Sequence, residues 1–379
     1  MASPLLEVTT LFFRLGLTAF GGPAAHIAMM EDEVVTRRKW MTREHFLDLV
    51  GATSLIPGPN STEMALHCGK ERAGWPGLLA AGAAFLLPAC SLTLLLAWVY
   101  VRFGEIPAIA PFFAGIRPAV LVIIIGAILK LGNKALKTRT LQVVGVLVVA
   151  AALLDISEIV ALLTAGLACL LIATGKSRGM ETPKSPVLFM MAGATSAGAV
   201  GMKTITTGGI FLSFLKIGSI LFGSGYVLIA YLEDELIHRL GWLTAQELLD
   251  AVAMGQFTPG PVLSTATFVG YQVGGLSGAA AATLGIFLPS FVFVAMLNPL
   301  IPVMRKSIAL RGFLDGVNTG AVGIMIAVAL TFGRDLMADW RDLVVFAMAG
   351  VMVWKFPKTS SVWLVLGGSS IGYLLRLTG

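Results

Sequence analysis

Hydrophobic residues run along this chain in long stretches that polar positions interrupt only briefly. A bilayer-spanning helix needs about 20 apolar residues, and stretches of that order recur at 76–101, 109–129, 158–173 and 279–301. These stretches show no alternation of apolar and polar residues with a period of two, which a transmembrane barrel would require. The pattern predicts an all-α, polytopic membrane protein.

The pattern also repeats. Residues 13–66 align with residues 215–268 at a constant offset of 202, and after one deletion the offset becomes 201. A polar stretch at 175–186, rich in Pro, Gly and Lys, lies between the copies, and an extra apolar segment, 187–202, follows it. We therefore expect an N-terminal repeat over 1–174, a linker with an extra transmembrane segment over 175–204, and a C-terminal repeat over 205–379.

The charges of the connecting loops indicate how the two copies face the membrane. Loops of the first copy near Lys70 and Lys130 are basic, whereas the short turn at Gly104-Glu105 is acidic. In the second copy the counterpart of that acidic turn is basic, with Arg305 and Lys306. Because basic loops stay in the cytoplasm, the copies are predicted to be inverted-topology repeats with broken or re-entrant helices, a pattern typical of secondary transporters.

Composition supports one class of protein, a multi-pass membrane protein, and argues against several others. The chain is 56% hydrophobic and 13% charged, with a net charge of +6, which fits a multi-pass protein of the inner (cytoplasmic) membrane with basic cytoplasmic loops. The basic residues are scattered, so nucleic acid is not expected as a partner. No phosphate-binding loop, metal-ligand spacing or cysteine pair is found, and we expect no metal, no cofactor and no enzyme activity. The oligomeric state stays open, a homo-oligomer included.

The first candidate site is a matched break within a short apolar segment. Phe20-Gly21-Gly22-Pro23 interrupts the first copy, and Phe222-Gly223-Ser224-Gly225 interrupts the second. Pro23 suits the first turn of a new helix, whose amino end favours an anion. A simple packing kink is the alternative, but two matched breaks favour a substrate site. His26, one turn beyond Pro23, is a candidate to bind the anion or carry protons, with a packed polar residue as the alternative.

The second candidate site is Pro57-Gly58-Pro59 with Asn60, Ser61 and Thr62, matched by Pro259-Gly260-Pro261. Pro-Gly-Pro ends one helix and starts another, and the hydroxyl and amide groups of the next turn can cap that helix or contact an oxyanion. Glu63 follows, where the second copy has Thr265. A carboxyl group buried in a membrane favours its neutral form, so Glu63 is a candidate proton-coupling residue.

Arg14 and Lys216 form a matched pair of cations, each two residues before a glycine in an apolar arm. Together they could neutralise a dianion near the centre of the membrane. Alternatively, each side chain extends to the membrane interface.

At these motifs the chain closely resembles the chromate transporter family, whose long members carry two homologous halves. The resemblance rests on Phe20–Pro23, on Trp40-Met41-Thr42 with Asp48, on Pro57–Pro59, and on their counterparts Phe222–Gly225, Trp242-Leu243-Thr244 with Asp250, and Pro259–Pro261. It implies export of chromate across the cytoplasmic membrane, with chromate resistance as the result. It also implies that sulfate, a dianion of the same shape, competes or is exchanged.

The sequence thus predicts a secondary transporter of a tetrahedral oxyanion in a lipid bilayer, with chromate as first choice and protons or a counter-anion as the coupled species. Two alternatives remain at this stage. One is a transporter of the same fold for sulfate or another small anion. The other is a membrane-embedded enzyme acting on a lipid phosphate, which would need clustered carboxylates for Mg²⁺.

Overall fold

The computed structural model describes residues 3–19, 22–53, 56–103, 114–154, 156, 158–175, 205–222, 227–297, 307–336, 339–356, 359 and 361–377. Within these ranges the regular structure is entirely helical. The helices of the first copy are α1 (Pro4–Thr18), α2 (Pro23–Glu31), η1 (Asp32–Arg37), α3 (Arg43–Thr53), α4 (Asn60–Phe103), α6 (Ile116–Ala135), α7 (Arg139–Leu153) and α8 (Glu158–Gly175). Those of the second copy are α10 (Thr207–Ile220), α11 (Leu228–Leu232), η4 (Glu233–Arg239), α12 (Ala245–Phe257), η5 (Val262–Ser264), α13 (Thr265–Leu297), α15 (Ile308–Leu336), α16 (Trp340–Lys355) and α17 (Ser361–Leu377).

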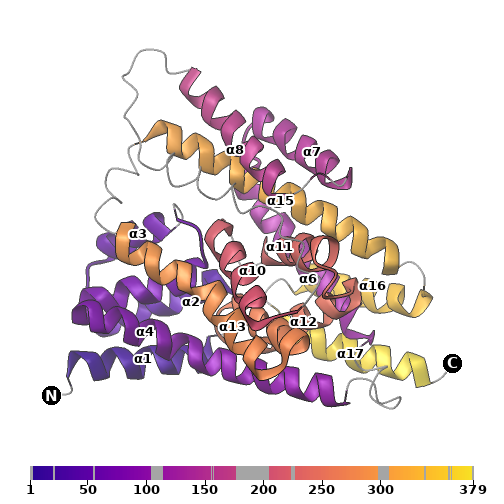
Figure 1. The fold of residues 1–379 in the computed structure, drawn as a ribbon, viewed down its shortest axis with the longest axis horizontal. Coiled ribbons are helices and arrows are strands. Elements are labelled where there is room, and N and C mark those ends of the chain that lie inside the picture. The colour runs from indigo at the N-terminus through magenta and orange to yellow at the C-terminus, as the bar shows by residue number, and fades with distance from the viewer. Residues whose placement is uncertain are drawn as a thin grey trace.

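Helix α1 illustrates how local sequence sets an element. The Ser3 hydroxyl accepts a hydrogen bond from the Leu6 amide, and Pro4 occupies the first turn, where its missing N–H costs nothing. Val8, Leu11, Phe12 and Leu15 are buried, a spacing of three and four residues that places them on one face. That face packs against α4 (Figure 1).

Helices α4 and α13 each reverse direction at a glycine and form a hairpin. The backbone leaves helical geometry at Ala73 and Gly74, with φ −139° and 65°, and at the matched Gly274 and Gly275, with φ −141° and 60°. A Cβ on Gly69 would overlap the carbonyl of Gly77, although eight residues of straight helix span about 12 Å. The same overlap joins the matched residues Gly270 and Gly278. Each Pro-Gly-Pro turn therefore leads into a short arm that folds back against a longer one.

The remaining helices exchange partners between the copies. In repeat 1 α6 leads into α7 and α8, and in repeat 2 α15 leads into α16 and α17. Helix α15 packs against α7 and α8, while α6 packs against α16 and α17 (Figure 1). Matched glycines allow both contacts, because a Cβ on Gly115 would lie 2.6 Å from the Gly368 carbonyl oxygen and one on Gly316 would overlap the Ala165 carbonyl. Each long helix thus packs on the last two helices of the other copy, as a twofold relation between them requires.

The outer surface is apolar where lipid would contact it. Large hydrophobic side chains are highly exposed, among them Leu154 at 75% and Trp354 at 85%, an exposure that soluble monomers avoid over wide areas. Among the described residues, four helical stretches are long and apolar enough to cross a bilayer, namely Asn60–Phe103, Ile116–Ala135, Val262–Met296 and Ile308–Arg334. The chain is a multi-pass membrane protein.

One feature lies beyond the sequence-based expectation. The acidic runs Glu31-Asp32-Glu33 and Glu233-Asp234-Glu235 fall at the starts of the π-helical turns η1 and η4, which the pattern of apolar residues does not indicate. Helix α7 has 15 residues, fewer than a perpendicular crossing needs. The extra segment 187–202 lies outside the described residues.

Candidate functional site

The two Pro-Gly-Pro turns are joined to opposite copies by a reciprocal pair of backbone hydrogen bonds. The Gly58 amide donates to the Leu221 carbonyl at 2.7 Å, and the Gly260 amide donates to the Ala19 carbonyl at 2.8 Å. Ala19 and Leu221 are themselves matched residues and follow α1 and α10 directly. The turns and the broken first arms of both repeats therefore meet at one interface.

Both turn glycines hold a backbone conformation that side chains disfavour. Gly58 has φ +137° and Gly260 has φ +90°. A Cβ on Gly58 would overlap the carboxylate of Glu63 and stand 2.5 Å from Ser290 Oγ, whereas one on Gly260 would stand 2.8 Å from the Ala89 Cβ. Ala89 and Ser290 are matched residues, so each turn faces the same position of the opposite copy.

The first turn carries buried polar groups whose hydrogen-bonding capacity is unused within the described part of the chain. Helix α4 begins at Asn60, and Ser61, Thr62 and Glu63 in its first turn are all at most 1% exposed. Their hydroxyl and carboxylate oxygens have no hydrogen-bond partner there, and neither has Ser290 Oγ. Because an unpaired polar group costs free energy when buried, this set of atoms is suited to receive a ligand or a proton.

The second turn satisfies its own hydroxyls. Thr258 Oγ1 donates to the Gly255 carbonyl at 2.9 Å and lies 3.2 Å from Ser264 Oγ. Thr265, which replaces Glu63, donates to the Val262 carbonyl at 2.8 Å. The matched turns therefore make equivalent backbone hydrogen bonds, but their polar side chains differ in chemistry.

The break in the first arm of repeat 1 has the predicted form. Helix α2 begins at Pro23, and Gly22 before it has φ +79° and supplies no side-chain cap. His26 is 1% exposed, and its Nε2 lies 3.0 Å from the Ala19 carbonyl that also accepts from Gly260. His26 is thereby brought to the second Pro-Gly-Pro turn. Gly21, Gly223, Ser224 and Gly225 lie outside the described residues.

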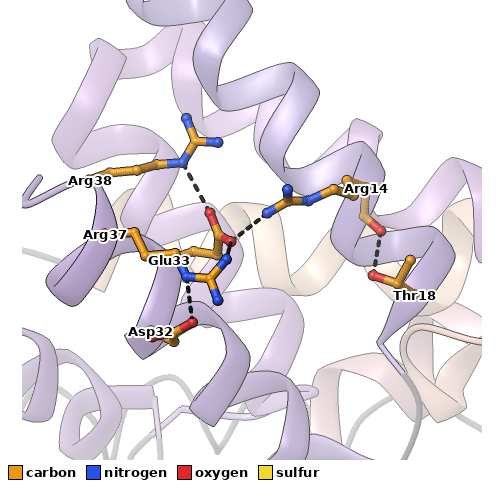
Figure 2. A network of polar contacts seen from close by, with 6 residues as sticks. All are labelled: Arg14, Thr18, Asp32, Glu33, Arg37 and Arg38. Carbon is orange, nitrogen blue, oxygen red and sulfur yellow. Dashed lines mark hydrogen bonds and ion pairs between the residues drawn. The ribbon is translucent and has the colours of Figure 1, made fainter.

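The matched cations are each held by a buried glutamate, and Figure 2 shows the cluster around Arg14. Arg14 Nη2 lies 2.5 Å from Glu33 Oε1, and Arg37 and Arg38 contact the same carboxylate at 3.2 Å. In repeat 2, Lys216 Nζ lies 2.7 Å from Glu235 Oε2, and Arg239 also pairs with Glu235. The expected role of Arg14 and Lys216 in binding a dianion stays a prediction. The substrate would have to compete with the glutamate that already binds each cation.

The acidic turns differ in their protonation equilibria. Burial raises the pKa of Glu33, but hydrogen bonds and charge from Arg38 and Arg14 outweigh it, so the pKa lies below the ordinary value. Burial raises the pKa of Asp234, and the nearby charges of Lys216, His238 and Arg239 only partly oppose it. The arginine-rich turn of repeat 1 thus favours an ionised carboxylate.

A buried ion pair between the repeats was not foreseen. Arg117 Nε and Nη2 donate to the two carboxylate oxygens of Asp250 at 2.9 Å each, and the Tyr100 hydroxyl donates to Asp250 at 2.7 Å. Arg117 lies within an apolar run and Asp250 follows the Trp-Leu-Thr motif, but their separation of 133 residues gives no sign of the pairing. The pair fixes α12, and with it the second turn, to α6.

Comparison with known proteins identifies the family of this chain. The family model described as chromate transporter matches residues 6–171 and 208–373. The chromate transport protein of Pseudomonas aeruginosa is 30% identical over 96% of this chain and 91% of its own length, and that of Cupriavidus metallidurans is 29% identical over 97% and 92%.

A shorter relative matches only part of the chain. The uncharacterized transporter YwrA of Bacillus subtilis is 29% identical over 33% of this chain and 71% of its own length. No solved structure matches. The family consists of transporters, so the alternative of a lipid-phosphate enzyme is set aside. The chain is a membrane transporter that belongs to the chromate transporter family.

Proposed function

We propose that this protein is a secondary active transporter that exports chromate across the cytoplasmic membrane and thereby confers chromate resistance. The names of its near-full-length relatives support the substrate. Chromate is a tetrahedral dianion, and a site for it needs donors and positive potential without a fixed negative charge facing it.

One observation carries the proposal: reciprocal backbone bonds join each Pro-Gly-Pro turn to the end of the opposite copy's first arm, and the first turn retains buried polar groups without partners among the described residues. We place the substrate between these turns and the broken first arms, near the bilayer midplane. The amino ends of α2 and α4 supply positive partial charge, and Ser61 and Thr62 supply hydroxyl donors.

Arg14 and Lys216 are proposed to act in competition with their glutamates. An oxyanion that approaches either cation replaces one carboxylate by another anion, so the exchange costs less than desolvating a free cation. Glu33 and Glu235 would hold these cations in place between transport events.

Alternating access follows from a twofold relation between the repeats. The exchanged packing of α6 and α15 supports such a relation, and the change of sign in the loop charges supports an axis in the membrane plane. We propose that the copies are inverted and that one rocks against the other around the turns.

We propose protons as the coupled species, with Glu63 as the group that binds them. Glu63 is fully buried and has no cation partner within the described residues, so its neutral form is favoured when the site is closed. His26 is a second candidate because its Nδ1 has no partner among the described residues. A counter-anion such as sulfate is the alternative coupled species.

The test is a flux assay with the purified protein in lipid vesicles. Chromate uptake and labelled sulfate uptake are measured with and without an imposed pH gradient, and each anion is also tested as a competitor of the other. Chromate flux that rises with the pH gradient supports the proposal. Sulfate flux that chromate does not inhibit would assign the site to a different anion.

A further inference from the structure

We propose that the first arm of α4 carries a proton relay, in which His67 passes protons between the cytoplasmic end of the arm and Glu63. This inference rests on the proposed proton coupling and adds the route by which the proton reaches its site. Of the residues involved, His67 and Glu71 have no part in the proposed anion site.

The relay is a stripe of ionisable residues on one helix face. Glu63, His67 and Glu71 follow one another at intervals of four, so they lie on successive turns of the same face of α4. Glu63 is 0% exposed and His67 is 1% exposed, whereas the Glu71 side chain is 39% exposed. The stripe therefore runs from a buried turn to the surface.

The buried members of the stripe are ready to exchange protons. His67 Nε2 and both carboxylate oxygens of Glu63 have no hydrogen-bond partner in the described part of the chain. Buried ionisable groups without partners are costly in a membrane and usually serve transport. A structural histidine would be expected to have its ring nitrogen bonded.

The outer end of the stripe has a second titratable group. His45 of α3 places Nε2 3.6 Å from Glu71 Oε1, and its side chain is 45% exposed. Lys70 and His45 are the charged groups that influence His67. On the neighbouring elements, Glu7 of α1 is paired with Arg72 at 2.7 Å, and His26 of α2 is buried. The other ionisable residues of the described elements that pack against α4 are Arg14 in α1, Glu31 in α2, Arg43, Glu44 and Asp48 in α3, Glu247 and Asp250 in α12, and Tyr271 in α13.

The arm has the length and the polarity that the relay needs. From Asn60 to the reversal at Ala73 it spans about 20 Å, enough to connect the middle of a bilayer with one surface. The loop charges predict that Lys70 and Arg72 lie on the cytoplasmic side.

The matched arm of α13 lacks the ionisable residues that this proton relay requires. Thr265, Val269 and Gln272 stand where the first arm has Glu63, His67 and Glu71, and none of them ionises near neutral pH. The two arms are matched helices, but only the arm of repeat 1 carries ionisable side chains at these three positions.

Each transfer is balanced. Glu71 or protonated His45 gives one proton to the unprotonated ring nitrogen of His67, and the imidazolium gives the proton on its other ring nitrogen to the Glu63 carboxylate. Glu63 is then neutral and His67 is again neutral. The donor at the surface, Glu71 or His45, has lost one proton. The reverse sequence releases the proton.

The experiment compares two fluxes in the same vesicles: net chromate flux driven by a pH gradient, and exchange of labelled chromate at equal pH on both sides. Exchange requires no proton to pass between Glu63 and the bulk solution. We expect His67→Gln to slow the gradient-driven flux by about tenfold or more and to leave exchange at the wild-type rate. Cys68→Ala, a change at the neighbouring buried side chain, should leave both fluxes unchanged.

Three results would contradict the relay, each for a different reason. If His67→Gln lowers both fluxes equally, His67 is structural and the relay is wrong; if it lowers neither, the relay is also wrong while the proton coupling stands. If wild-type flux ignores the pH gradient, the proposed coupling itself fails and the relay with it. Should His67→Gln not fold, the double variant His45→Gln with Glu71→Gln removes both surface donors and must slow the gradient-driven flux alone.

Discussion

The two Pro-Gly-Pro turns make matched backbone contacts but are surrounded by different chemistry. Gly58 and Gly260 have positive φ angles, donate to matched carbonyls, and face the matched residues Ser290 and Ala89. Around the first turn a carboxyl and three hydroxyls have no partner among the described residues, while around the second the hydroxyls bond to neighbouring carbonyls or to each other. The duplicated backbone is therefore the scaffold, and the polar side chains that differ between the copies carry the chemical specialisation.

The largest difference in stability should come from the anchors of the two turns. Asp250→Ala removes a carboxylate that binds Arg117 and Tyr100, and it leaves Arg117 without its partner. We expect a loss of about 3–5 kcal/mol in the free energy of unfolding, because the remaining cation is largely buried. Thermal unfolding in detergent, followed by tryptophan fluorescence, measures it.

The control is Asp48→Ala at the matched position in α3. Asp48 is exposed, so solvent screens whatever interaction its carboxylate makes, and we expect a change of about 0.5 kcal/mol or less. Equal losses for the two variants would show that Arg117 is not what distinguishes the second turn.

The next largest effect should come from the turn glycines. Gly58→Ala forces a Cβ against Glu63 and Ser290 in a backbone region that alanine disfavours, and we expect a loss of about 1–3 kcal/mol together with loss of transport. Gly260→Ala should lose a similar amount, because its Cβ meets Ala89.

Second-site changes make this prediction specific. Ser290→Gly should recover part of the stability of Gly58→Ala, and Ala89→Gly should do the same for Gly260→Ala. The crossed combinations should recover nothing. Recovery in a crossed pair would contradict the reciprocal facing of the two turns.

Chemistry rather than stability should separate the third pair of variants. We expect Glu63→Gln to abolish the response of chromate flux to a pH gradient while exchange at equal pH continues, because the amide keeps the shape but binds no proton. Thr265→Val loses one internal hydrogen bond, worth about 1 kcal/mol, and should keep the pH response. A pH response that survives Glu63→Gln would move the proton site to His26.

Local sequence was sufficient for the helix boundaries of the site. Proline and glycine act on the backbone directly, so the starts of α2 at Pro23 and of α4 at Asn60 were predictable. The family and the all-helical membrane fold followed from motifs in order and from apolar runs of spanning length.

Partners far apart in the chain were not predictable from a single sequence. The bond between Glu33 and Arg14 depends on how α1 and η1 pack, which no local pattern around either residue indicates. Ser290 gave no signal, because a serine in an apolar helix beside Pro289 is usually a local helix cap or kink. Its importance appears only where it faces Gly58 from the other repeat.

The smallest expected effect concerns the acidic turn of repeat 1. The pKa of Glu33 lies below the ordinary value because Arg38 and Arg14 favour its ionised form more than burial disfavours it. Its ionised form therefore stabilises the fold fully above the ordinary glutamate pKa, and this contribution is lost as the pH falls through the lower, folded-state pKa. Arg14 and Arg37 are more than half exposed, so the contribution should be about 1 kcal/mol or less.

Glu33→Gln tests this contribution by removing the titration while keeping the shape of the side chain. The unfolding temperature of the wild type should fall more steeply with acidification than that of Glu33→Gln, and the two curves should converge at the acid end of the range. High salt should reduce the difference in unfolding temperature between the wild type and Glu33→Gln at neutral pH, because the arginines of the network are exposed to solvent and their charges are screened. Parallel curves over the whole range would mean that Arg14 and Arg38 do not hold this carboxylate in its charged form, and would free Arg14 for the anion that the transporter carries.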